Sequence, residues 1–479
     1  MTGTVQDKER GRLRRAGALA LFFLRVLLPW TALSEEKTEA LTVSLPETVL
    51  GFTSCEIRID SPAAGEAELR LLDEMNNLWL TRREQISAGE NILSWDGLGA
   101  NEERLRSETY RFDVTVREAD GTERAASAKF SMKGSTPTLV YALPSDGTLY
   151  LNQRERWFVE CFVSAGCIGV MEVSDSNGET VLHQEYQITE KDGKIIYWNG
   201  KLNGRGQAAP GTYTVRMWSK MNPGYVREFP LTIEENAPQA AQVDVTGPVM
   251  PERGMSDEEI WEIMMKPSVV INANGSWRRF PLYARKSTGS RTVANLRCAL
   301  QGLEILETDG TWAYVRAGNH NTGKAAEGYL LLKTLKVVKP AAHYGVLVDK
   351  REQTLTVYED GKKIGTVPVS TGLPTERDAY LETPPGAFLT DVHNGASFAQ
   401  EGYRYEYPLR YDGMNFIHGS GYVRSERVRD YSRNLQLLGQ KASHGCIRVS
   451  LFMQDDCPIT SYWLWTHLPY RTRVIVLDD

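Results

Sequence analysis

The sequence predicts a mainly β, multidomain chain, and three observations lead to this prediction. At 479 residues the chain is too long for one hydrophobic core, so three to five domains are expected. Beyond residue 41, many short runs alternate apolar and polar residues, which is the period of half-buried strands. The 41 glycines suit the many tight turns that such strands need.

Residues 1–34 have the pattern of an export signal. Five basic residues between Lys8 and Arg15 precede the apolar run Ala16–Leu24, and small residues end the region. A retained membrane anchor is the alternative, which Arg25 weakens because a spanning helix needs roughly 20 apolar residues. Positive residues before the run place the remainder outside the cytoplasm. We therefore expect a protein of the cell envelope, either exported or tethered by this segment.

Charge and cysteine usage narrow the function classes. The net charge is −6 and no basic tract occurs beyond the N-terminus, so nucleic acid is not an expected partner. Six cysteines are sparse for an exported chain of this length, which argues against a disulfide scaffold. Cys161 and Cys167 could pair, but buried free thiols are the favoured interpretation.

Residues 41–133 and 137–233 are predicted to form two β-sandwich domains that repeat each other. The pattern Trp-Asp/Asn-Gly occurs at 95–97 and 198–200, each time fifteen residues before a tyrosine that opens a strand. The offset of 103 residues is about the length of one sandwich domain. The pattern resembles the Ig-like domains of bacterial surface proteins. We expect its aromatic residues to fill cores rather than to bind a ligand.

A linker, residues 234–276, contains one short predicted helix. Ser256 and Glu259 have the spacing of a capping box, and Pro267 ends the helix. We expect this helix to pack against a neighbouring domain.

Residues 277–338 are predicted to form a small barrel. The order Leu-x-Ile-Leu, Asp-Gly-x-Trp-x-Tyr-Val and Gly-Tyr-Leu resembles bacterial SH3-like domains, which commonly bind cell-wall peptides. Trp312 and Tyr314 of this motif suit either a core or a ligand surface. Binding therefore does not follow from the resemblance, because fold does not fix function.

Residues 342–479 are predicted to form a further β domain that carries the chemistry. Cys446 follows a glycine, His444 lies two residues before it, and a strand predicted to end at His418 precedes both. A thiolate nucleophile needs an imidazole to take its proton. Gly445 lets the backbone approach a substrate carbonyl, with N–H groups facing a developing oxyanion. The pattern indicates a thiol acyl-transfer site.

Four motifs of this domain resemble the L,D-transpeptidase catalytic domain, the YkuD-like family. They are Val-Ser-Thr-Gly at 369–372, Thr-Pro-Pro-Gly-x-Phe at 383–388, Ile-His-Gly at 417–419 and Ser-His-Gly-Cys-Ile-Arg at 443–448. The resemblance implies a β-sandwich or barrel. A polar, arginine-rich insert at 422–441 departs from the shorter forms of the family. We expect it to be a solvated lid, with capture of a substrate carboxylate as the alternative.

The resemblance also implies a role for each site residue. The implied catalytic residues are Cys446, His418, His444 and Gly445. The residues implied to orient the loop or the substrate are Arg448, Ser443, Gly419 and Tyr422. Cys446 would be the nucleophile, and His418 the base, held by the backbone carbonyl of Gly419. N–H groups around Gly445 and Cys446 would form the oxyanion hole.

The implied reaction is transfer of a peptidoglycan stem peptide. The thiolate would release D-alanine from a tetrapeptide stem, and an amine of a second stem would resolve the thioester as a 3→3 cross-link. The implied partners are stem peptides and the bacterial cell wall, and no cofactor is implied. Water or a protein amine as acceptor would give an L,D-carboxypeptidase or an enzyme that anchors proteins to the wall. A wall-binding protein without activity is the alternative from another class.

The remaining candidates of this domain are assigned to structure. A metal site built from His418, His444 and Cys446 is disfavoured, because the spacing lacks paired ligands. His393 is expected at the surface, with a place near the cleft as the alternative. Cys457, like the nearby tryptophans, is expected in the core.

Overall fold

The computed structural model confirms a mainly β chain built from several separate sheets. It describes residues 40–479 except 153–155, 205, 237–249, 273–279, 297–299, 320, 321, 323, 376–380, 394, 414, 426, 427, 455 and 456. The predicted export signal, residues 1–34, lies outside the described residues. In the part of the chain that is described, no helix is long and apolar enough to cross a membrane.

The first sandwich consists of a three-stranded sheet, order β1-β3-β6, and a five-stranded sheet, order β2-β8-β7-β4-β5. Its elements are β1 (Thr42–Ser44), β2 (Thr48–Gly51), β3 (Cys55–Ser61), β4 (Gly65–Asp73), β5 (Leu78–Ile86), β6 (Gly89–Trp95), the 3-10 helix η1 (Ala100–Glu102), β7 (Thr109–Glu118) and β8 (Glu123–Ser135). The alternation read from the sequence is the burial pattern of β7, in which every second side chain from Tyr110 to Val116 is buried.

The second sandwich has the same division, with sheets β14-β11-β9 and β10-β16-β15-β12-β13. Its strands are β9 (Leu139–Pro144), β10 (Thr148–Tyr150), β11 (Phe158–Val163), β12 (Cys167–Ser174), β13 (Thr180–Ile188), β14 (Lys194–Tyr197), β15 (Gly211–Ser219) and β16 (Asn222–Glu234). Cys161 and Cys167 are buried free thiols here, as expected.

The sequence repeat corresponds to a repeat of contacts. The indole N–H of Trp95 donates to the carbonyl of Leu98 at 2.9 Å, and that of Trp198 donates to the carbonyl of Lys201 at 2.8 Å. Both tryptophans are buried in the cores of their sandwiches, as are the tyrosines that open β7 and β15. The prediction that these aromatic residues fill cores is therefore confirmed.

The predicted linker helix is α1 (Asp257–Met265), and its capping box is present. Ile260, Ile263 and Met264 are buried against residues of the C-terminal domain, including Ile475. The helix therefore packs on a neighbouring domain, as expected.

The barrel that follows has a five-stranded sheet, order β19-β18-β22-β21-β20, and the pair β17-β23. Its elements are β17 (Ser268–Ile271), β18 (Phe280–Tyr283), β19 (Thr292–Leu296), β20 (Glu304–Thr308), β21 (Trp312–Asn319), β22 (Lys324–Leu331), η3 (Leu332–Thr334) and β23 (Leu335–Val338). Ala313 and Val315 are fully buried, whereas Trp312 and Tyr314 alternate with them and are only half-buried. The innermost core of this domain is therefore formed by Ala313 and Val315 rather than by Trp312 and Tyr314.

The C-terminal domain contains the sheets β26-β25-β24-β35-β27 and β30-β31-β34, and the hairpins β28-β29 and β32-β33. Its elements are β24 (Tyr344–Asp349), β25 (Thr354–Glu359), β26 (Lys362–Pro368), β27 (Gly386–Leu389), β28 (Ser397–Gln400), β29 (Tyr403–Glu406), β30 (Leu409–Asp412), β31 (Asn415–Gly419), β32 (Val423–Ser425), β33 (Val428–Asp430), α2 (Ser432–Leu435), β34 (Ile447–Val449), α3 (Ser461–His467) and β35 (Arg473–Leu477). Side chains of both larger sheets and of α3 share one core.

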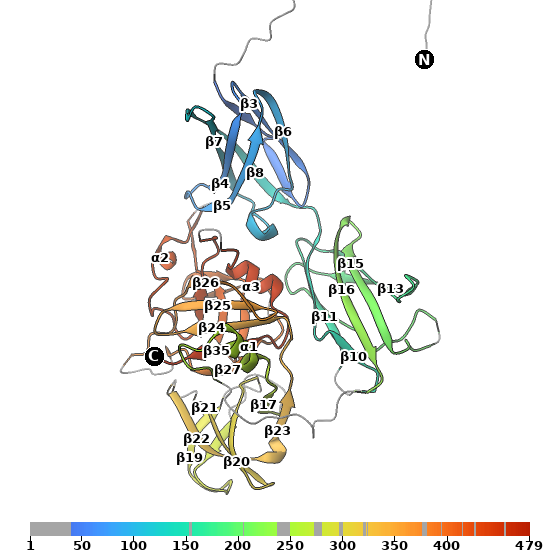
Figure 1. Ribbon diagram of the computed structural model, residues 1–479, viewed down its shortest axis with the longest axis vertical. Helices are drawn as coiled ribbons and strands as arrows, with labels where there is room; N and C mark the ends of the chain where they lie inside the picture. Colours follow the sequence, from blue (N-terminus) through green and yellow to red (C-terminus); the bar gives the residue numbers. More distant parts are fainter. Residues whose placement is uncertain are drawn as a thin grey trace, which may run out of the picture.

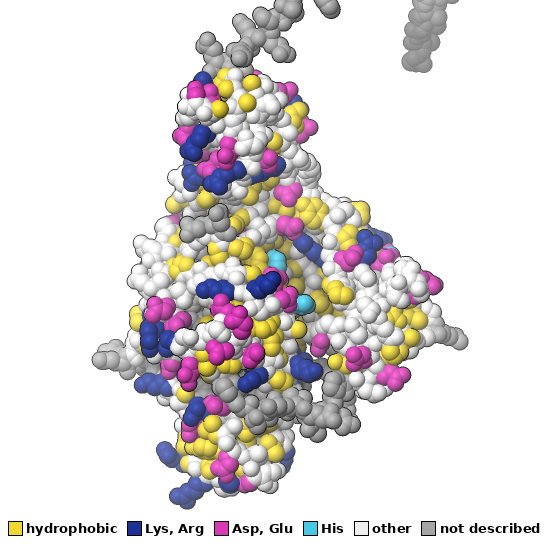
Figure 2. All heavy atoms as spheres, viewed as in Figure 1, with side chains coloured by type: hydrophobic (Ala, Val, Ile, Leu, Met, Phe, Trp, Pro, Cys, Tyr) yellow, Lys and Arg dark blue, Asp and Glu magenta, His cyan; other side chains and the backbone are white. Residues whose placement is uncertain are grey.

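The C-terminal domain lies at the centre of the molecule (Figure 1). The first sandwich is above it in this view, the second sandwich is beside it, and the barrel is below it. Figure 2 shows acidic and basic side chains interspersed over the same face. The domain that carries the predicted chemistry is therefore in a position to be supported from several sides.

Candidate active site

Two paired strands bring the predicted nucleophile and base together. β31 and β34 run parallel, with Ile417 opposite Ile447 and His418 opposite Arg448. Cys446 directly precedes β34, and its sulfur accepts a hydrogen bond from the backbone N–H of Phe416 at 3.5 Å. Residues two apart on a strand point to the same face. Phe416, and His418 two residues later, therefore line one face beside the cysteine.

His418 is held as a neutral base. Its Nδ1 lies 2.8 Å from the carbonyl oxygen of Gly419, as the resemblance implied. A carbonyl only accepts, so Nδ1 carries the proton and Nε2 keeps the lone pair. Burial, aided by the nearby Arg448 charge, lowers the pKa of His418 to about 3 against the opposing Gly419 hydrogen bond. The imidazole is therefore neutral near pH 7 and able to accept a proton.

An aromatic hairpin, β28-β29, covers this base. We call residues 397–406 the cover hairpin. The rings of Phe398 and Tyr405 meet the imidazole of His418 edge-on, with centroids 5.2 and 4.7 Å away. Phe398 also lies 5.4 Å from Phe416, on the same face of β31. The cover hairpin was not singled out from the sequence, although the alternation Tyr403-x-Tyr405 is a strand signal.

The loop before Cys446 is tightly closed on itself. Gly445 has φ +108°, and a Cβ there would lie 2.9 Å from Oδ1 of Asn415. The Ser443 hydroxyl donates to the carbonyl of Cys446 at 2.5 Å and accepts from the N–H of Gly445 at 3.2 Å. Ser443 thus orients the loop. The Gly445 N–H already has an acceptor, which departs from the expectation that it faces an oxyanion.

The threonine of the Thr-Pro-Pro-Gly motif supports the same loop. Thr383 is fully buried, and its hydroxyl donates to the carbonyl of Gly445 at 2.9 Å. The same hydroxyl accepts from the N–H of Gly372 at 2.8 Å. One side chain therefore joins three of the four sequence motifs. The role of Thr383 was missed, although its motif was recognised.

Arg448 is a buried support rather than an exposed anion binder. Its Nη1 donates to the side chain of Asn434 at 3.2 Å and to the carbonyl of Ala442 at 3.3 Å. Its guanidinium carbon lies 5.7 Å from the centre of the Tyr405 ring. Of the two roles predicted for Arg448, these contacts favour orientation of the loop.

His444 is the exposed member of the predicted set. Its side chain is 47% exposed, and Nδ1 lies 3.5 Å from the carboxylate of Glu401 at the tip of the cover hairpin. His444 therefore lies where the loop and the hairpin tip meet.

The described part of the insert at 422–441 is only partly solvated, so the prediction of a solvated lid is corrected in part: Arg424 and Arg433 are exposed, whereas Tyr422 and Tyr431 are not. The rings of Tyr422 and Tyr431 are buried and lie 5.1 Å apart. Arg429 lies over Tyr422 and forms a 2.5 Å ion pair with Glu108 of the first sandwich. Part of the insert therefore packs against the first sandwich, through its buried tyrosine rings and the ion pair of Arg429 with Glu108. The buried ring of Tyr422 gives it a packing role, whereas a role in orienting substrate was predicted.

His393 is also buried, so its predicted place at the surface is wrong. Its Nδ1 lies 3.0 Å from the carboxylate of Glu160 in the second sandwich. Its ring lies between Tyr141 and Trp465. The carboxylate partner from another domain, which is not readable from local sequence, makes this burial possible.

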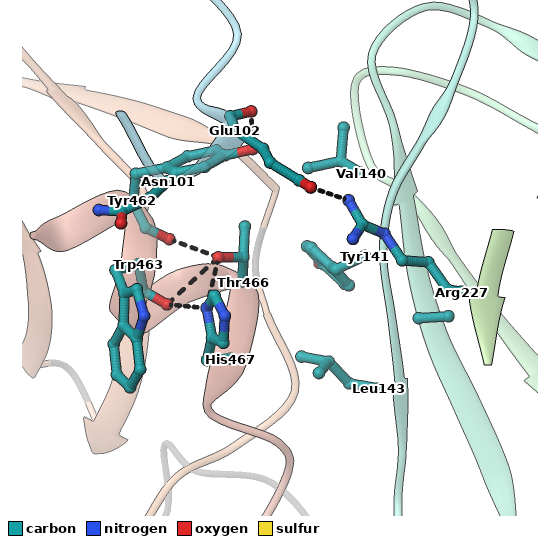
Figure 3. Close-up of a pocket in the computed structure, with 11 residues that line it drawn as sticks. Asn101, Glu102, Val140, Tyr141, Leu143, Arg227, Tyr462, Trp463, Thr466 and His467 are labelled. Carbon is teal, nitrogen blue, oxygen red and sulfur yellow. Dashed lines mark hydrogen bonds and ion pairs between the residues drawn. The ribbon is translucent and has the colours of Figure 1, made fainter. Parts of the chain in front are cut away.

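A separate cavity of about 420 Å³ lies between the two sandwiches and α3 (Figure 3). Arg227 of the second sandwich and Glu102 of the first form an ion pair across it. Tyr462 and His467 contribute its wall on the C-terminal domain. None of the predicted site residues lines this cavity. Among the described residues, no group of three or more His, Cys, Asp or Glu side chains is arranged to hold a metal ion.

Comparison with known proteins identifies the C-terminal domain. Residues 343–476 match the family model of the L,D-transpeptidase catalytic domain, YkuD. The chain therefore contains an L,D-transpeptidase catalytic domain, as the four motifs predicted. The L,D-transpeptidase YciB of Bacillus subtilis (strain 168) is 28% identical over 138 residues, which are 28% of this chain. The match covers 66% of that relative's length.

The chain is also similar, at low identity, to parts of solved structures. An L,D-transpeptidase from Mycobacterium smegmatis is 16% identical, with 45% of this chain and 92% of that chain covered and a TM-score of 0.23. An L,D-transpeptidase from Mycobacterium tuberculosis H37Rv is 18% identical, with 38% and 77% covered and a TM-score of 0.23.

Proposed function

We propose that this protein is a cell-wall L,D-transpeptidase that uses Cys446 as its nucleophile. The observation that carries the proposal is the pairing of β31 with β34. This pairing sets a neutral His418, with the proton on Nδ1, on the strand beside Cys446. An imidazole with a lone pair on Nε2, next to a thiol and under an aromatic cover, suits general-base activation of sulfur.

The proposed first half-reaction forms a thioester. His418 takes the thiol proton as sulfur attacks the carbonyl that joins the third stem residue to D-alanine. Because burial favours the neutral imidazole, His418 can accept the thiol proton as sulfur attacks. Collapse of the oxyanion breaks the peptide bond, and D-alanine leaves with the proton from His418. N–H groups of the loop at Cys446 are the proposed oxyanion donors.

The proposed second half-reaction sets the product. An amine of a second stem attacks the thioester, His418 takes its proton, and the Cys446 thiol is restored as a 3→3 cross-link forms. Water in place of that amine would give an L,D-carboxypeptidase, and a protein amine would give wall anchoring. The proposed partners are peptidoglycan stem peptides, and the proposed location is the cell envelope, reached through residues 1–34.

The test is analysis of reaction products by mass spectrometry. We expect the wild type to convert purified tetrapeptide muropeptides to 3→3 dimers with release of D-alanine, and Cys446→Ala to form none. Cys55→Ala, in the first sandwich, is the matched control and should keep full activity. Formation of dimers by Cys446→Ala would contradict the proposed mechanism.

Reaction with imipenem distinguishes an active enzyme from a wall-binding protein without activity. One related L,D-transpeptidase has been solved in complex with imipenem. We expect one adduct on the Cys446 peptide of the folded wild type. A folded protein that binds wall fragments, without adduct and without products, would favour the non-catalytic alternative.

A further inference from the structure

A buried charged cluster joins the first sandwich to the cover hairpin. Arg106 comes from the segment before β7, and Glu406 is the last residue of β29. Their side chains are only 9% and 8% exposed, and their ion pair spans 300 residues of sequence. Burying such a pair costs desolvation free energy unless hydrogen bonds satisfy both charged groups. The buried position of Arg106 and Glu406 therefore indicates a structural or functional role.

The contacts of the cluster use both oxygens of the Glu406 carboxylate. Nε and Nη2 of Arg106 lie 3.0 and 2.9 Å from Oε1, and the hydroxyl of Tyr431 donates to Oε2 at 3.0 Å. Arg106 also donates to the hydroxyl of Tyr407, which in turn donates to Glu103 at 2.9 Å. Burial raises the pKa of Glu103 to about 8. Glu406 makes the closer contacts with Arg106, at 2.9 and 3.0 Å, whereas Glu103 lies 3.7 Å away.

Strand geometry connects this cluster to the catalytic base. Neighbouring residues of a strand point to opposite faces. Glu406 points to the first sandwich, whereas Tyr405 packs its ring on His418 at 4.7 Å. Whatever fixes the backbone at Glu406 therefore also fixes the ring that covers the base.

We propose that Arg106 is a positioning residue for the transferase site. By holding Glu406 on the face opposite Tyr405, it keeps the cover hairpin closed over His418, beside Cys446. The first sandwich is then part of the catalytic unit rather than only a spacer. This inference rests on the proposed function, because it assigns Arg106 a role in the same reaction.

The experiment measures two rates at Cys446 by peptide mass spectrometry: acylation by imipenem and alkylation by iodoacetamide. In Arg106→Met we expect acylation to slow about tenfold, because small misplacements of catalytic groups are expensive. We expect alkylation to become severalfold faster, because an open hairpin would leave the strand ends at His418 and Cys446 more accessible. Arg106→Lys should restore part of the acylation rate. A general loss of structure would not produce opposite changes in a protein that still shows native circular dichroism.

Two further variants complete the test. Arg227→Met removes the more exposed ion pair with Glu102, which does not touch the hairpin, and should leave both rates unchanged. Arg106→Met with Glu406→Gln replaces the buried pair by neutral groups, so it keeps the test valid if the single variant does not fold. We expect it to show the same opposite changes.

The failing outcomes are distinct. Unchanged rates in folded Arg106→Met or in the folded double variant, or two rates that fall together, would overturn the role of Arg106. Absence of an imipenem adduct on the wild type would instead overturn the proposed function.

Discussion

The catalytic loop and the cover hairpin are supported in two different ways. The loop that contains Gly445 is hydrogen-bonded to Thr383 in the turn at 383–386. The barrel in turn contacts this turn and β27 through backbone atoms. The N–H of Gly302 donates to the carbonyl of Ala387 at 2.6 Å, and Gly318 packs against the carbonyl of Pro385. The hairpin is held by two backbone hydrogen bonds between Arg404 and Tyr422 and, in addition, by long side chains such as Arg106 on Glu406.

This difference should set how each side responds to change. A close backbone contact leaves no rotamer to adjust, so even one added methyl group must move the chain. A contact between long side chains can be remade in part by rotation or by a similar group. We therefore expect changes at the loop and its turn to have the larger effects on catalysis.

The largest effect is expected for Gly445→Ala. The new Cβ would meet Asn415 at 2.9 Å, at a residue with φ +108°. The loop would shift, and the loss of one oxyanion donor costs about 10²–10³ in kcat. Steady-state assays of dimer formation would measure this. Gly439→Ala is the control, because φ is +83° there but nothing lies within 4 Å of the new atom. Equal losses in both variants would mean that backbone strain, not the Asn415 contact, is responsible.

A smaller loss is expected for Thr383→Val. The variant keeps the shape but leaves the N–H of Gly372 and the carbonyl of Gly445 without this partner. Two buried groups without a partner cost about 2–6 kcal/mol of stability. We expect kcat to fall about 10–100-fold, as for other misplaced loops. Denaturant unfolding and product assays measure the two effects. Thr356→Val, which loses only a hydroxyl contact with Thr366, should be much milder.

The same contrast explains how far the sequence could be interpreted. Backbone-supported features leave local signals, so the proximity of Cys446, His418 and the motifs around Thr383 was predictable. The carbonyl of Gly419 as partner of the base was predicted as well. Contacts between side chains far apart in sequence leave no such signal. Arg106 and Glu406 are ordinary charged residues until the fold brings them together.

The errors have the same cause. The insert at 422–441 was expected to be solvated because of its arginines, but buried tyrosines and an ion pair with Glu108 hold part of it against the first sandwich. His393 was expected at the surface, and Glu160 from another domain makes its burial possible. In both cases tertiary partners override local composition.

A still smaller effect is expected where the barrel meets the turn, for Gly318→Ala. Its Cβ would lie 2.5 Å from the carbonyl oxygen of Pro385, so the turn or the barrel must move. Gly318 contacts the turn and not the loop that contains Cys446, so we expect acylation by imipenem to slow only severalfold. Gly147→Ala has open space and should change nothing. A loss as large as that of Gly445→Ala would mean that the barrel, not the loop itself, dominates loop geometry.

Protonation of His418 should have the smallest effect on catalysis near pH 7, because the imidazole is neutral there. Its effect should instead be visible at lower pH, in the free energy of unfolding. The unfolded histidine binds a proton below about pH 6.5, whereas burial keeps the folded pKa at about 3. Within this window the unfolded state binds more protons, so the free energy of unfolding should fall as pH falls. Between pH 6.5 and 5 the loss is about 1.6 kcal/mol. Urea unfolding of wild type and His418→Asn would isolate this loss, because His467, whose pKa burial also lowers, is common to both proteins. Arg106→Met should reduce the loss if opening the hairpin rehydrates the imidazole. An equal pH dependence in wild type and His418→Asn would show that the cover hairpin does not keep His418 from water.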